Sequence, residues 1–356
     1  MGLWKNIKKK INEYKLNRRI ARTKYIHVMF NDKFNKPYVD FINSNFDSRE
    51  HLILVHPICT FPMPEGENVV VIQKMKHIKF NGRKTEKIIF HSLFDSEFVD
   101  YLYAHPDILK EKAYWYIWGG DFYDAPKDEK NDFIRKNFKG YIACVKGDEE
   151  LAAKTYNANA ETFYAQYGTA LNEDDFKNNI YQQKHDTLNI LINNSSDFST
   201  LEIMDLLKKF NSENIKIYTI LSYGQTQFNE KILEKGRYLF GDKFEGLTEY
   251  MSKKDYINFL SSCDILILNQ DRQQGCGNAL MMLALGKKVF IKSNVTTFNC
   301  LNYWGMDIFD TLLLKNMTLD EIRTISDEQI ERNKKSVFVY YSNDAKTKTW
   351  KKVFES

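Results

Sequence analysis

The stretch "LNQDRQQGCGNALMMLALG", residues 268–286, joins the end of an apolar strand to the start of an apolar helix. Polar residues follow the strand, and two glycines, Gly275 and Gly277, precede the helical pattern. Glycine lets backbone N–H groups approach a ligand closely, and a helix N-terminus carries about half a positive charge. Because Arg272 can add a bidentate contact to a phosphate, the stretch is a candidate diphosphate-binding turn in an α/β sheet. A purely structural turn is the alternative, since Gly-x-Gly before a helix is a weak signal.

Short apolar runs alternate with helical patterns on both sides of this stretch. The runs are rich in β-branched and aromatic residues, as parallel strands covered on both faces tend to be. Such alternation predicts a doubly wound α/β sheet, once before and once after a polar connection at about residues 172–186. The expected strands are 25–30, 51–56, 68–72, 87–90, 115–118, 141–145, 188–192, 215–221, 264–268 and 288–291, and the expected helices include 94–103, 200–210, 229–240, 255–262 and 277–285.

The length of 356 residues exceeds one ordinary core and suits two domains. Hydrophobic residues make up 43% and charged residues 28%, which is typical of a soluble globular protein. The expected segments are a leader helix at 1–22, a first Rossmann-like domain at 23–178, a second at 186–335 and a C-terminal segment at 336–356.

Polar turns follow three strands of the second half. In open α/β sheets, ligands bind beyond the C-terminal ends of the strands, so these turns are candidate ligand sites. Together they point to a bound diphosphate more strongly than any one of them does. The candidate binding residues are Asn193, Asn194 and Ser195 after the first strand, Tyr223 and Gly224 after the second, and Arg272, Gln273, Gln274, Gly275, Gly277 and Asn278 after the strand at 264–268.

The first half contributes "AYWYIWGGDFYD", residues 113–124, in which an aromatic strand ends in Gly119 and Gly120 and Asp121 follows. Paired glycines leave room for a ligand, and Asp121 is predicted to be a general base for a substrate hydroxyl. The alternative is that Asp121 caps the following helix. His91, which ends the strand at 87–90, is expected at the same rim, where a structural, hydrogen-bonded histidine is the alternative.

Several classes of protein are excluded by missing motifs. The sequence contains no G-x-x-x-x-G-K-[ST], no G-x-S-x-G and no early G-x-G-x-x-G, which argues against a P-loop NTPase, an α/β-hydrolase and a nicotinamide enzyme. The five cysteines include no C-x-x-C pair, which favours reduced thiols in a cytoplasm and no zinc site. No secretory signal and no run of about 18 apolar residues is present.

The basic charge of the chain is concentrated at its start. Residues 1–24 hold nine Lys and Arg and one acid, a charge of +8, whereas the whole chain carries +4, so the remainder is net acidic. Leu3, Trp4, Ile7, Ile11 and Tyr14 recur at helical spacing. This pattern predicts a basic amphipathic helix at 1–22 that lies on an anionic membrane surface. A helix packed on the protein is the main alternative, and a nucleic-acid partner is not expected.

Five segments resemble the bacterial 4-acetamido-4,6-dideoxygalactose (Fuc4NAc) transferases, also called 4-α-L-fucosyltransferases. They are "WYIWGGDFYD" (115–124), "LINNSSD" (191–197), "SYG" (222–224), "CDILILNQDRQQGCGN" (263–278) and "VFVYYSNDAKTKTW" (337–350). The resemblance extends from about residue 25 to residue 356. It implies a glycosyltransferase of the GT-B type, with two Rossmann-like domains facing a cleft and no metal or cofactor required. The absence of any D-x-D motif agrees with that expectation.

The resemblance also implies the substrates. The donor would be a dTDP-activated amino-deoxy sugar held by the three polar turns, and the acceptor a polyprenyl-diphosphate-linked saccharide on the cytoplasmic face of the inner membrane. Asp121 would face the acceptor in the first domain, and the segment 336–356 would return to that domain. A sugar-nucleotide epimerase of the same build and a non-catalytic, membrane-docked nucleotide-binding module are the alternatives.

Overall fold

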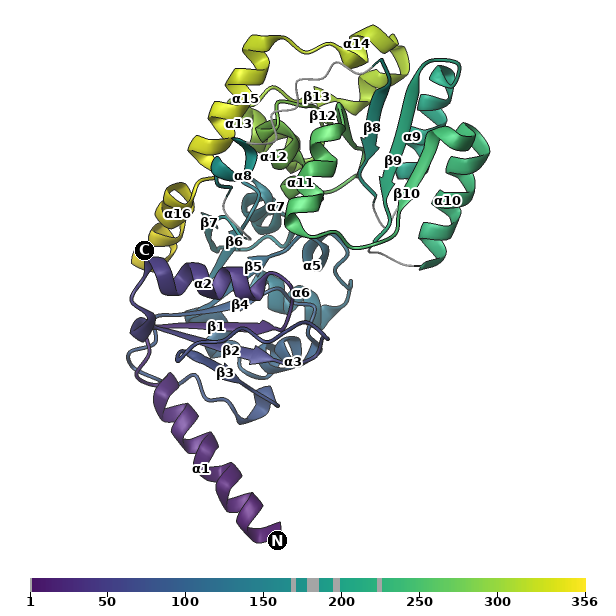
Figure 1. Cartoon of the computed structure of the whole chain (residues 1–356). Coiled ribbons are helices and arrows are strands. Elements are labelled where there is room, and N and C mark those ends of the chain that lie inside the picture. Colours follow the sequence, from purple (N-terminus) through teal and green to yellow (C-terminus); the bar gives the residue numbers. More distant parts are fainter. Residues whose placement is uncertain (1, 168–170, 178–185, 195–198, 223–225) are drawn as a thin grey trace. The chain divides into compact units, whose positions relative to one another are not determined.

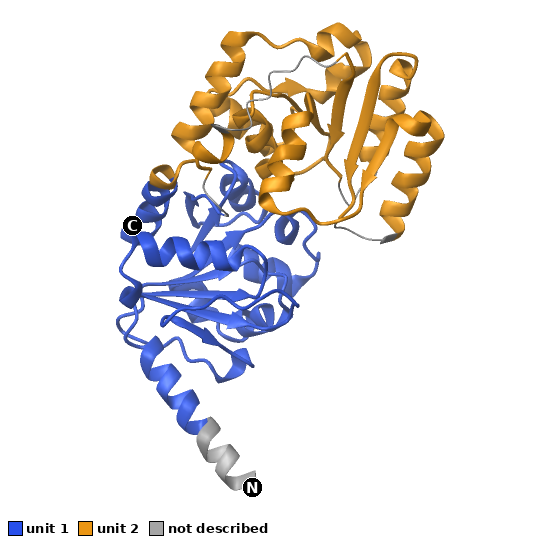
Figure 2. Ribbon diagram, in the orientation of Figure 1, with its two compact units in different colours: residues 1–169, 346–356 blue, residues 170–345 orange. Residues whose placement is uncertain are grey.

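The computed structural model of the chain describes residues 2–167, 171–177, 186–194, 199–222 and 226–356, and for residues 2–9, 177 and 226 the backbone alone. The chain forms two compact units, coloured separately in Figure 2. Unit 1 comprises residues 1–169 and 346–356, and unit 2 comprises residues 170–345. Three of the expected site residues, Ser195, Tyr223 and Gly224, lie outside the described residues.

Unit 1 is built on a seven-stranded parallel sheet in the order β3-β2-β1-β4-β5-β6-β7 (Figure 1). The strands alternate with helices along the chain, as a doubly wound sheet requires. Their bounds are β1 Tyr25–Phe30, β2 His51–His56, β3 Val69–Val71, β4 Lys87–His91, β5 Ala113–Ile117, β6 Gly140–Ala143 and β7 Glu161–Tyr164.

Unit 2 contains a six-stranded parallel sheet in the order β10-β9-β8-β11-β12-β13. Adjacent β8 and β11 pair in register, with Ile190 opposite Ile265. The chain leaves β8 toward β9 on one side and continues from β11 toward β12 on the other, which is the strand order of a Rossmann fold. The strands are β8 Leu188–Ile192, β9 Ile215–Ile220, β10 Phe244–Leu247, β11 Ile265–Leu268, β12 Lys288–Ile291 and β13 Phe309–Asp310.

Side chains cap some of the helices: Asp95 accepts from the Glu97 N–H at the start of α3, and Ser252 accepts from the Asp255 N–H at the start of α11. The α-helices are α1 Gly2–Ile20, α2 Asn35–Asn45, α3 Ser96–Ala104, α4 Pro106–Glu111, α5 Gly120–Tyr123, α6 Glu129–Lys136, α7 Asp148–Thr155, α8 Asp174–Lys177, α9 Ser199–Leu207, α10 Thr226–Phe240, α11 Lys253–Ser262, α12 Cys276–Ala284, α13 Thr296–Tyr303, α14 Leu319–Arg323, α15 Asp327–Tyr340 and α16 Asn343–Glu355. Short 3-10 turns are η1 Ser48–Glu50, η2 Met75–His77, η3 Lys208–Phe210, η4 Gly241–Lys243 and η5 Thr311–Asn316.

Each sheet has an apolar core on both faces, because alternate side chains of a strand point to opposite sides. In unit 1, α3, α4, α6 and α7 cover one face, and α2 and α16 cover the other. In unit 2, α11, α12, α13 and α15 pack on one face, and α9, α10 and α14 on the other. The continuous apolar runs of the sequence thus become strands buried on both sides.

Residues 346–356 belong to the core of unit 1. Trp350 is fully buried and donates its indole N–H to the Gln166 carbonyl at 2.8 Å, while Tyr25 donates to the Phe354 carbonyl at 2.6 Å. The segment expected at 336–356 is therefore divided: α15 runs to Tyr340 within unit 2, and the chain enters unit 1 at Lys346.

The second half of α1 is packed on unit 1. Ile20 is completely buried in the core, and Asn17 both donates to the His77 carbonyl and accepts from the Lys79 N–H. Ile11 and Tyr14, further toward the start of the helix, are exposed. The alternative of a packed helix thus holds for the last turns of α1.

Candidate active site

The predicted diphosphate site lies at the point of the unit 2 sheet where the strand order reverses. β8 and β11 are neighbours there, and their following chains diverge, which is the position where open α/β sheets bind ligands. Asn193 and Asn194 follow β8, and residues 269–275 lead from β11 to α12. The structure thus brings two of the three predicted polar turns together, while the third, at residues 222–224, is described only at Ser222.

Side-chain amides join these turns. Asn278 donates to the Asn193 side-chain oxygen at 2.8 Å, and Gln270 donates to the Asn193 carbonyl at 2.8 Å. Gln274 donates to the Asn194 carbonyl at 3.4 Å. Because each amide connects residues about 80 positions apart, the network fixes the end of β8 against the start of α12. Asn193 and Asn278 therefore shape the site through their bonds to each other.

Two buried oxygens of the network have no donor within the described part of the chain. They are the Asn194 Oδ1 and the Gln274 Oε1. Buried polar atoms in folded proteins are nearly always hydrogen-bonded, so the two oxygens are candidate acceptors for ligand hydroxyl or N–H groups. Asn194 itself is only 2% exposed.

The two glycines of the turn do different things. Gly275 has a φ of +69°, and a side chain there would approach the Leu268 Cδ2 to 2.6 Å and the Asn193 Nδ2 to 2.9 Å. It permits the tight turn into α12. Gly277, in the first turn of the helix, has no atom within 4 Å of the position of a Cβ. No side chain caps α12, so the open space beside Gly277 borders the helix N-terminus.

Two basic side chains lie at this edge of the sheet. Arg272 is half-buried and reaches the Gln273 carbonyl at 3.4 Å. Lys292, which sequence reasoning missed, directly follows β12, and its Nζ lies 2.6 Å from the exposed Asp271 carboxylate. A lysine immediately after a buried strand at the ligand edge was the available signal. The site thus combines a helix N-terminus with Arg272 and with Lys292, whose charge is paired with that of Asp271. A helix N-terminus beside an arginine suits an anion.

In unit 1, Asp121 is held in place as a structural residue. It is 2% exposed, and its carboxylate accepts from the Trp115 indole at 2.7 Å, the Trp118 N–H at 2.9 Å and the Leu93 N–H at 3.0 Å. Burial raises the pKa of Asp121, and the three hydrogen bonds oppose that rise. The carboxylate ties the end of β4 to the end of β5, and the general-base role predicted for it receives no support from these contacts.

The glycines before Asp121 make a tight turn. Gly119 has a φ of +100°, which favours glycine, and a Cβ on Gly120 would meet the Phe94 ring at 2.9 Å. Neither observation points to a ligand. Their role as substrate-binding residues stays a prediction.

The prediction that His91 lies at the rim was wrong. His91 is completely buried, because the last position of β4 faces the core that α2 and α16 cover. Its Nε2 lies 3.1 Å from the His27 Nδ1, and the His27 Nε2 lies 3.0 Å from the His51 Nδ1. Desolvation lowers the pKa of His91 to about 3 and that of His51 to about 4, and it lowers the pKa of His27 well below its usual value. The structural alternative therefore holds.

A histidine–aspartate pair at the carboxyl edge of the unit 1 sheet was not predicted from the sequence. His56 is the last residue of β2, and its Nδ1 lies 2.6 Å from the Oδ2 of Asp95, which precedes α3. The His56 side chain is 10% exposed and that of Asp95 is 4% exposed. The only sequence signal was a histidine ending a buried strand, since its partner stands 39 positions away.

Two Rossmann-like units, each built on a parallel sheet, form the architecture of the GT-B type. Solved glycosyltransferases share this fold. One from Rickettsia africae aligns with a TM-score of 0.64 at 11% identity, over 93% of this chain and 98% of the other. HepE from Anabaena, in complex with UDP and glucose, gives 0.65 at 11%, over 94% and 100%. The trehalose-6-phosphate synthase OtsA gives 0.64 at 9%, over 94% and 99%.

The family follows from the sequence. Residues 63–356 match the family described as 4-alpha-L-fucosyltransferase, glycosyl transferase group 56, and the chain belongs to it. The resemblance drawn from the five motifs is thereby confirmed. The protein is a glycosyltransferase, with a nucleotide-sugar donor and a sugar-accepting partner.

Proposed function

We propose that the protein transfers an amino-deoxy sugar such as Fuc4NAc from a dTDP-sugar to a polyprenyl-diphosphate-linked saccharide, in the synthesis of a cell-surface polysaccharide. The observation that supports a nucleotide-sugar donor in unit 2 is the open space at Gly277, in the first turn of a helix whose N-terminus no side chain caps. The turns on either side of the switch point also hold two oxygens without a donor, those of Asn194 and Gln274. A diphosphate would meet the helix amides, and the orphaned oxygens would accept from donor hydroxyl or N–H groups.

The same groups would assist departure of the nucleotide. Negative charge grows on the diphosphate as the bond to the sugar breaks, and preorganised positive charge stabilises that state. Arg272 and the first turn of α12 would supply this charge, with Lys292 beside them. Their contribution would be larger in the transition state than in the bound donor, which is the condition for catalysis.

Calorimetric titration with dTDP, UDP, GDP and NAD, each with and without EDTA, tests this proposal. We expect dTDP to bind and EDTA to leave its affinity unchanged. A preference for UDP or GDP would agree with a glycosyltransferase but would mean that the donor is a UDP-sugar or a GDP-sugar. Binding of NAD alone, or of none of the four, would contradict a nucleotide-sugar site in unit 2.

Replacing Arg272 should weaken dTDP binding without unfolding unit 2. Arg272→Ala removes a charged hydrogen-bond donor from the site, so we expect a loss of about 1.5–3 kcal/mol of binding free energy. Arg237→Ala, which truncates an exposed arginine on α10, is the control and should bind normally. Unchanged affinity in Arg272→Ala would place the diphosphate elsewhere.

The two glycines give a sharper comparison. Gly277→Ala adds a methyl group in open space, so it should leave the melting temperature near that of the wild type and still weaken dTDP binding. Gly275→Ala adds the same group at a positive φ against Leu268 and Asn193, so it should lower the melting temperature itself. Calorimetry and thermal unfolding of both variants check this. Tight dTDP binding by Gly277→Ala would argue against a ligand at the start of α12.

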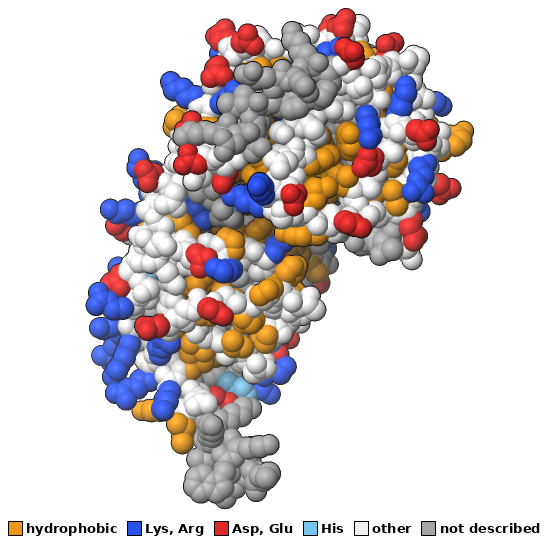
Figure 3. All heavy atoms as spheres, in the orientation of Figure 1, with side chains coloured by type: hydrophobic (Ala, Val, Ile, Leu, Met, Phe, Trp, Pro, Cys, Tyr) orange, Lys and Arg blue, Asp and Glu red, His pale blue; other side chains and the backbone are white. Residues whose placement is uncertain are grey.

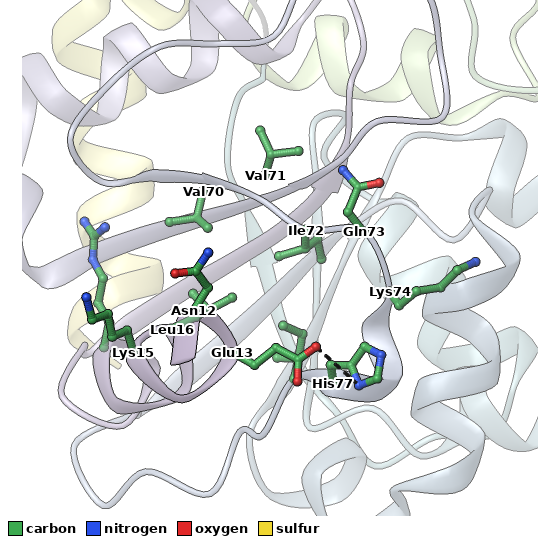
Figure 4. A pocket seen from close by; sticks show the side chains of 12 residues that line it. Asn12, Glu13, Lys15, Leu16, Val70, Val71, Ile72, Gln73, Lys74 and His77 are labelled. Atoms are coloured by element: carbon green, nitrogen blue, oxygen red, sulfur yellow. Dashed lines mark ion pairs between the residues drawn. The ribbon is translucent and has the colours of Figure 1, made fainter. Parts of the chain in front are cut away.

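We further propose that the first unit meets an anionic membrane through α1. Among the described residues, no helix combines the length and apolar character needed to cross a bilayer. A groove of about 710 Å³ runs between α1 and β3, lined by Leu16, Val70 and Ile72 and by Lys15 and Lys74 (Figure 4). Figure 3 shows Lys and Arg side chains and apolar side chains near this part of unit 1. Apolar surface bordered by basic groups suits a bilayer interface.

Removing residues 1–9 should release the protein from anionic vesicles without lowering its melting temperature. This deletion takes away Lys5, Lys8 and Lys9 and leaves the buried contacts of Ile20 and Asn17 intact. A deletion of residues 1–20 would lose those contacts and should also destabilise unit 1. Vesicle co-sedimentation and thermal unfolding distinguish the two. If the variant that lacks residues 1–9 still binds the vesicles, these residues are not the membrane contact.

A further inference from the structure

We infer that His56 is the general base that accepts the proton of the acceptor hydroxyl, and that Asp95 is its positioning residue. The inference rests on the proposed sugar transfer and assigns the acceptor to the carboxyl edge of the unit 1 sheet. The hydrogen bond of 2.6 Å between the His56 Nδ1 and the Asp95 Oδ2 carries it.

The geometry fixes which nitrogen is free. A carboxylate can only accept, so the His56 Nδ1 carries the proton that it donates to Asp95, and in the neutral imidazole the Nε2 keeps its lone pair. Asp95 is itself held, because its Oδ1 accepts from the Glu97 N–H at 2.9 Å at the start of α3. Within the described residues the His56 Nε2 has no hydrogen-bond partner, and a tenth of the side chain is exposed. A fixed imidazole with one available lone pair is the arrangement of a base oriented by a carboxylate.

The position in the sheet is that of a ligand site. β2 lies beside β1, and the order of unit 1 reverses between β1 and β4, so the end of β2 borders the switch point. Asn31, directly after β1, donates to the carbonyls of Cys59 and Phe61 and so holds the loop that follows His56. Ile58, Phe61 and Phe94 are exposed around these strand ends, and such side chains can pack against a sugar or a prenyl chain.

The other histidines of the described chain lack this combination. His27, His51 and His91 are in the core and bond to one another. His77 is a half-buried partner of Glu13 at 3.9 Å, and His105 points its Nδ1 at the Tyr101 carbonyl. His56 alone among them joins a carboxylate at hydrogen-bond distance to a position at the ligand edge.

The transfer of the sugar is a single displacement at the anomeric carbon, with one bond formed and one broken. The acceptor oxygen forms a bond to the anomeric carbon while the bond from that carbon to the diphosphate oxygen breaks, and the electron pair leaves with the nucleoside diphosphate. The hydroxyl proton passes to the His56 Nε2 and then to solvent. Attack from the side opposite the leaving group inverts the anomeric centre, so the inference commits the enzyme to inversion.

Kinetics of three variants test the base role. The donor probe is dTDP-Fuc4NAc, and the acceptor is a short-chain polyprenyl-diphosphate-linked saccharide. We expect His56→Gln to lower kcat by about 10²–10⁴-fold, the usual contribution of a general base, with dTDP affinity unchanged. Asp95→Asn should lower kcat and alter the pH profile. His105→Gln, which changes a histidine at the other end of α3, should behave as the wild type.

The pH profile must be interpreted with the neighbouring groups in view. Four titratable groups lie around the His56–Asp95 pair, on the segments that follow β1, β2 and β3 and on α3: Asp32, Cys59, Lys74 and Glu97. The expected result is loss of the acidic limb of kcat/KM in His56→Gln and recovery of activity by added imidazole in His56→Ala. Rescue distinguishes a missing base from a distorted fold.

Two measurements on the wild type complete the test. Long-range proton–nitrogen NMR should find His56 with its proton on Nδ1, and the product should have the opposite anomeric configuration to the donor. A proton on Nε2, a retained configuration, or more than a tenth of wild-type kcat in His56→Gln would overturn the base role alone. A wild type that neither binds dTDP nor transfers the sugar would overturn the proposed function, and the base role with it.

Discussion

Lowering the pH from 8 to 5 should destabilise unit 1 by roughly 6 kcal/mol through its three buried histidines. Histidine in an unfolded chain has a pKa near 6.5, whereas burial holds the pKa values of His27, His51 and His91 far below this value. Below about pH 6.5 the three histidines therefore bind protons in the unfolded chain but stay neutral in the folded unit. At pH 5 each such histidine favours the unfolded state by about 2 kcal/mol, almost independently of its folded pKa.

The direction of the stability change and the pH range in which it occurs follow from the same pKa values. Because the folded pKa values are depressed, the stabilisation is present above about pH 6.5 and is lost as the pH falls toward 4 and 3, the folded values of His51 and His91. Urea denaturation between pH 8 and 5, followed by tryptophan fluorescence, measures it. Trp115, Trp118 and Trp350 report on unit 1.

The variant His51→Phe measures the contribution of one histidine to the pH dependence of stability. His51→Phe places a ring among Tyr25, Phe46 and Phe354, which already pack around His51. The pH slope of stability below pH 6 should then fall by about 1.4 kcal/mol per pH unit, the contribution of one histidine. Equal slopes for the variant and the wild type would show that His51 is not a neutral, buried group.

Asp121→Ala should lower the stability of unit 1 by about 3–5 kcal/mol, because it leaves three buried donors without an acceptor. Those donors are the Trp115 indole and the N–H groups of Trp118 and Leu93. Asp121→Asn keeps one of the two oxygens and should cost less. Thermal and urea unfolding of both variants provide the measurement.

The Asp121→Asn variant also separates structure from catalysis. If the residue is structural, the variant at a temperature where it is fully folded should keep most of the wild-type kcat and the same pH profile. Loss of the acidic limb in the folded variant would instead return the base role to Asp121 and contradict its assignment to His56.

The fold was largely readable because its strands are continuous apolar runs. β8 and β12 were predicted to the residue, since each is a buried run bounded by polar turns. β7 and β10 were missed because they are short, partly exposed edge strands that each contain a glutamate.

The candidate site could be predicted only in part from the sequence, for two physical reasons. A strand end in a sequence does not show which face its last side chain takes, so His91 was placed at the rim although it lies in the core. Contacts between distant residues are also invisible: His56 and Asp95 are 39 positions apart, and Asn193 and Asn278 are 85 apart. The polar turns of unit 2 were found because their residue types alone suggest an anion site.

The return of residues 346–356 to unit 1 has a consequence for biosynthesis. Trp350 and Phe354 complete the core that Tyr25 and Tyr38 begin, so a ribosome must translate all of unit 2 before the missing side chains of unit 1 exist. Unit 2 is one continuous segment and can close first. The nascent unit 1 meanwhile exposes an apolar sheet face that chaperones can bind. A stop codon near position 346 would therefore damage the unit that is translated first.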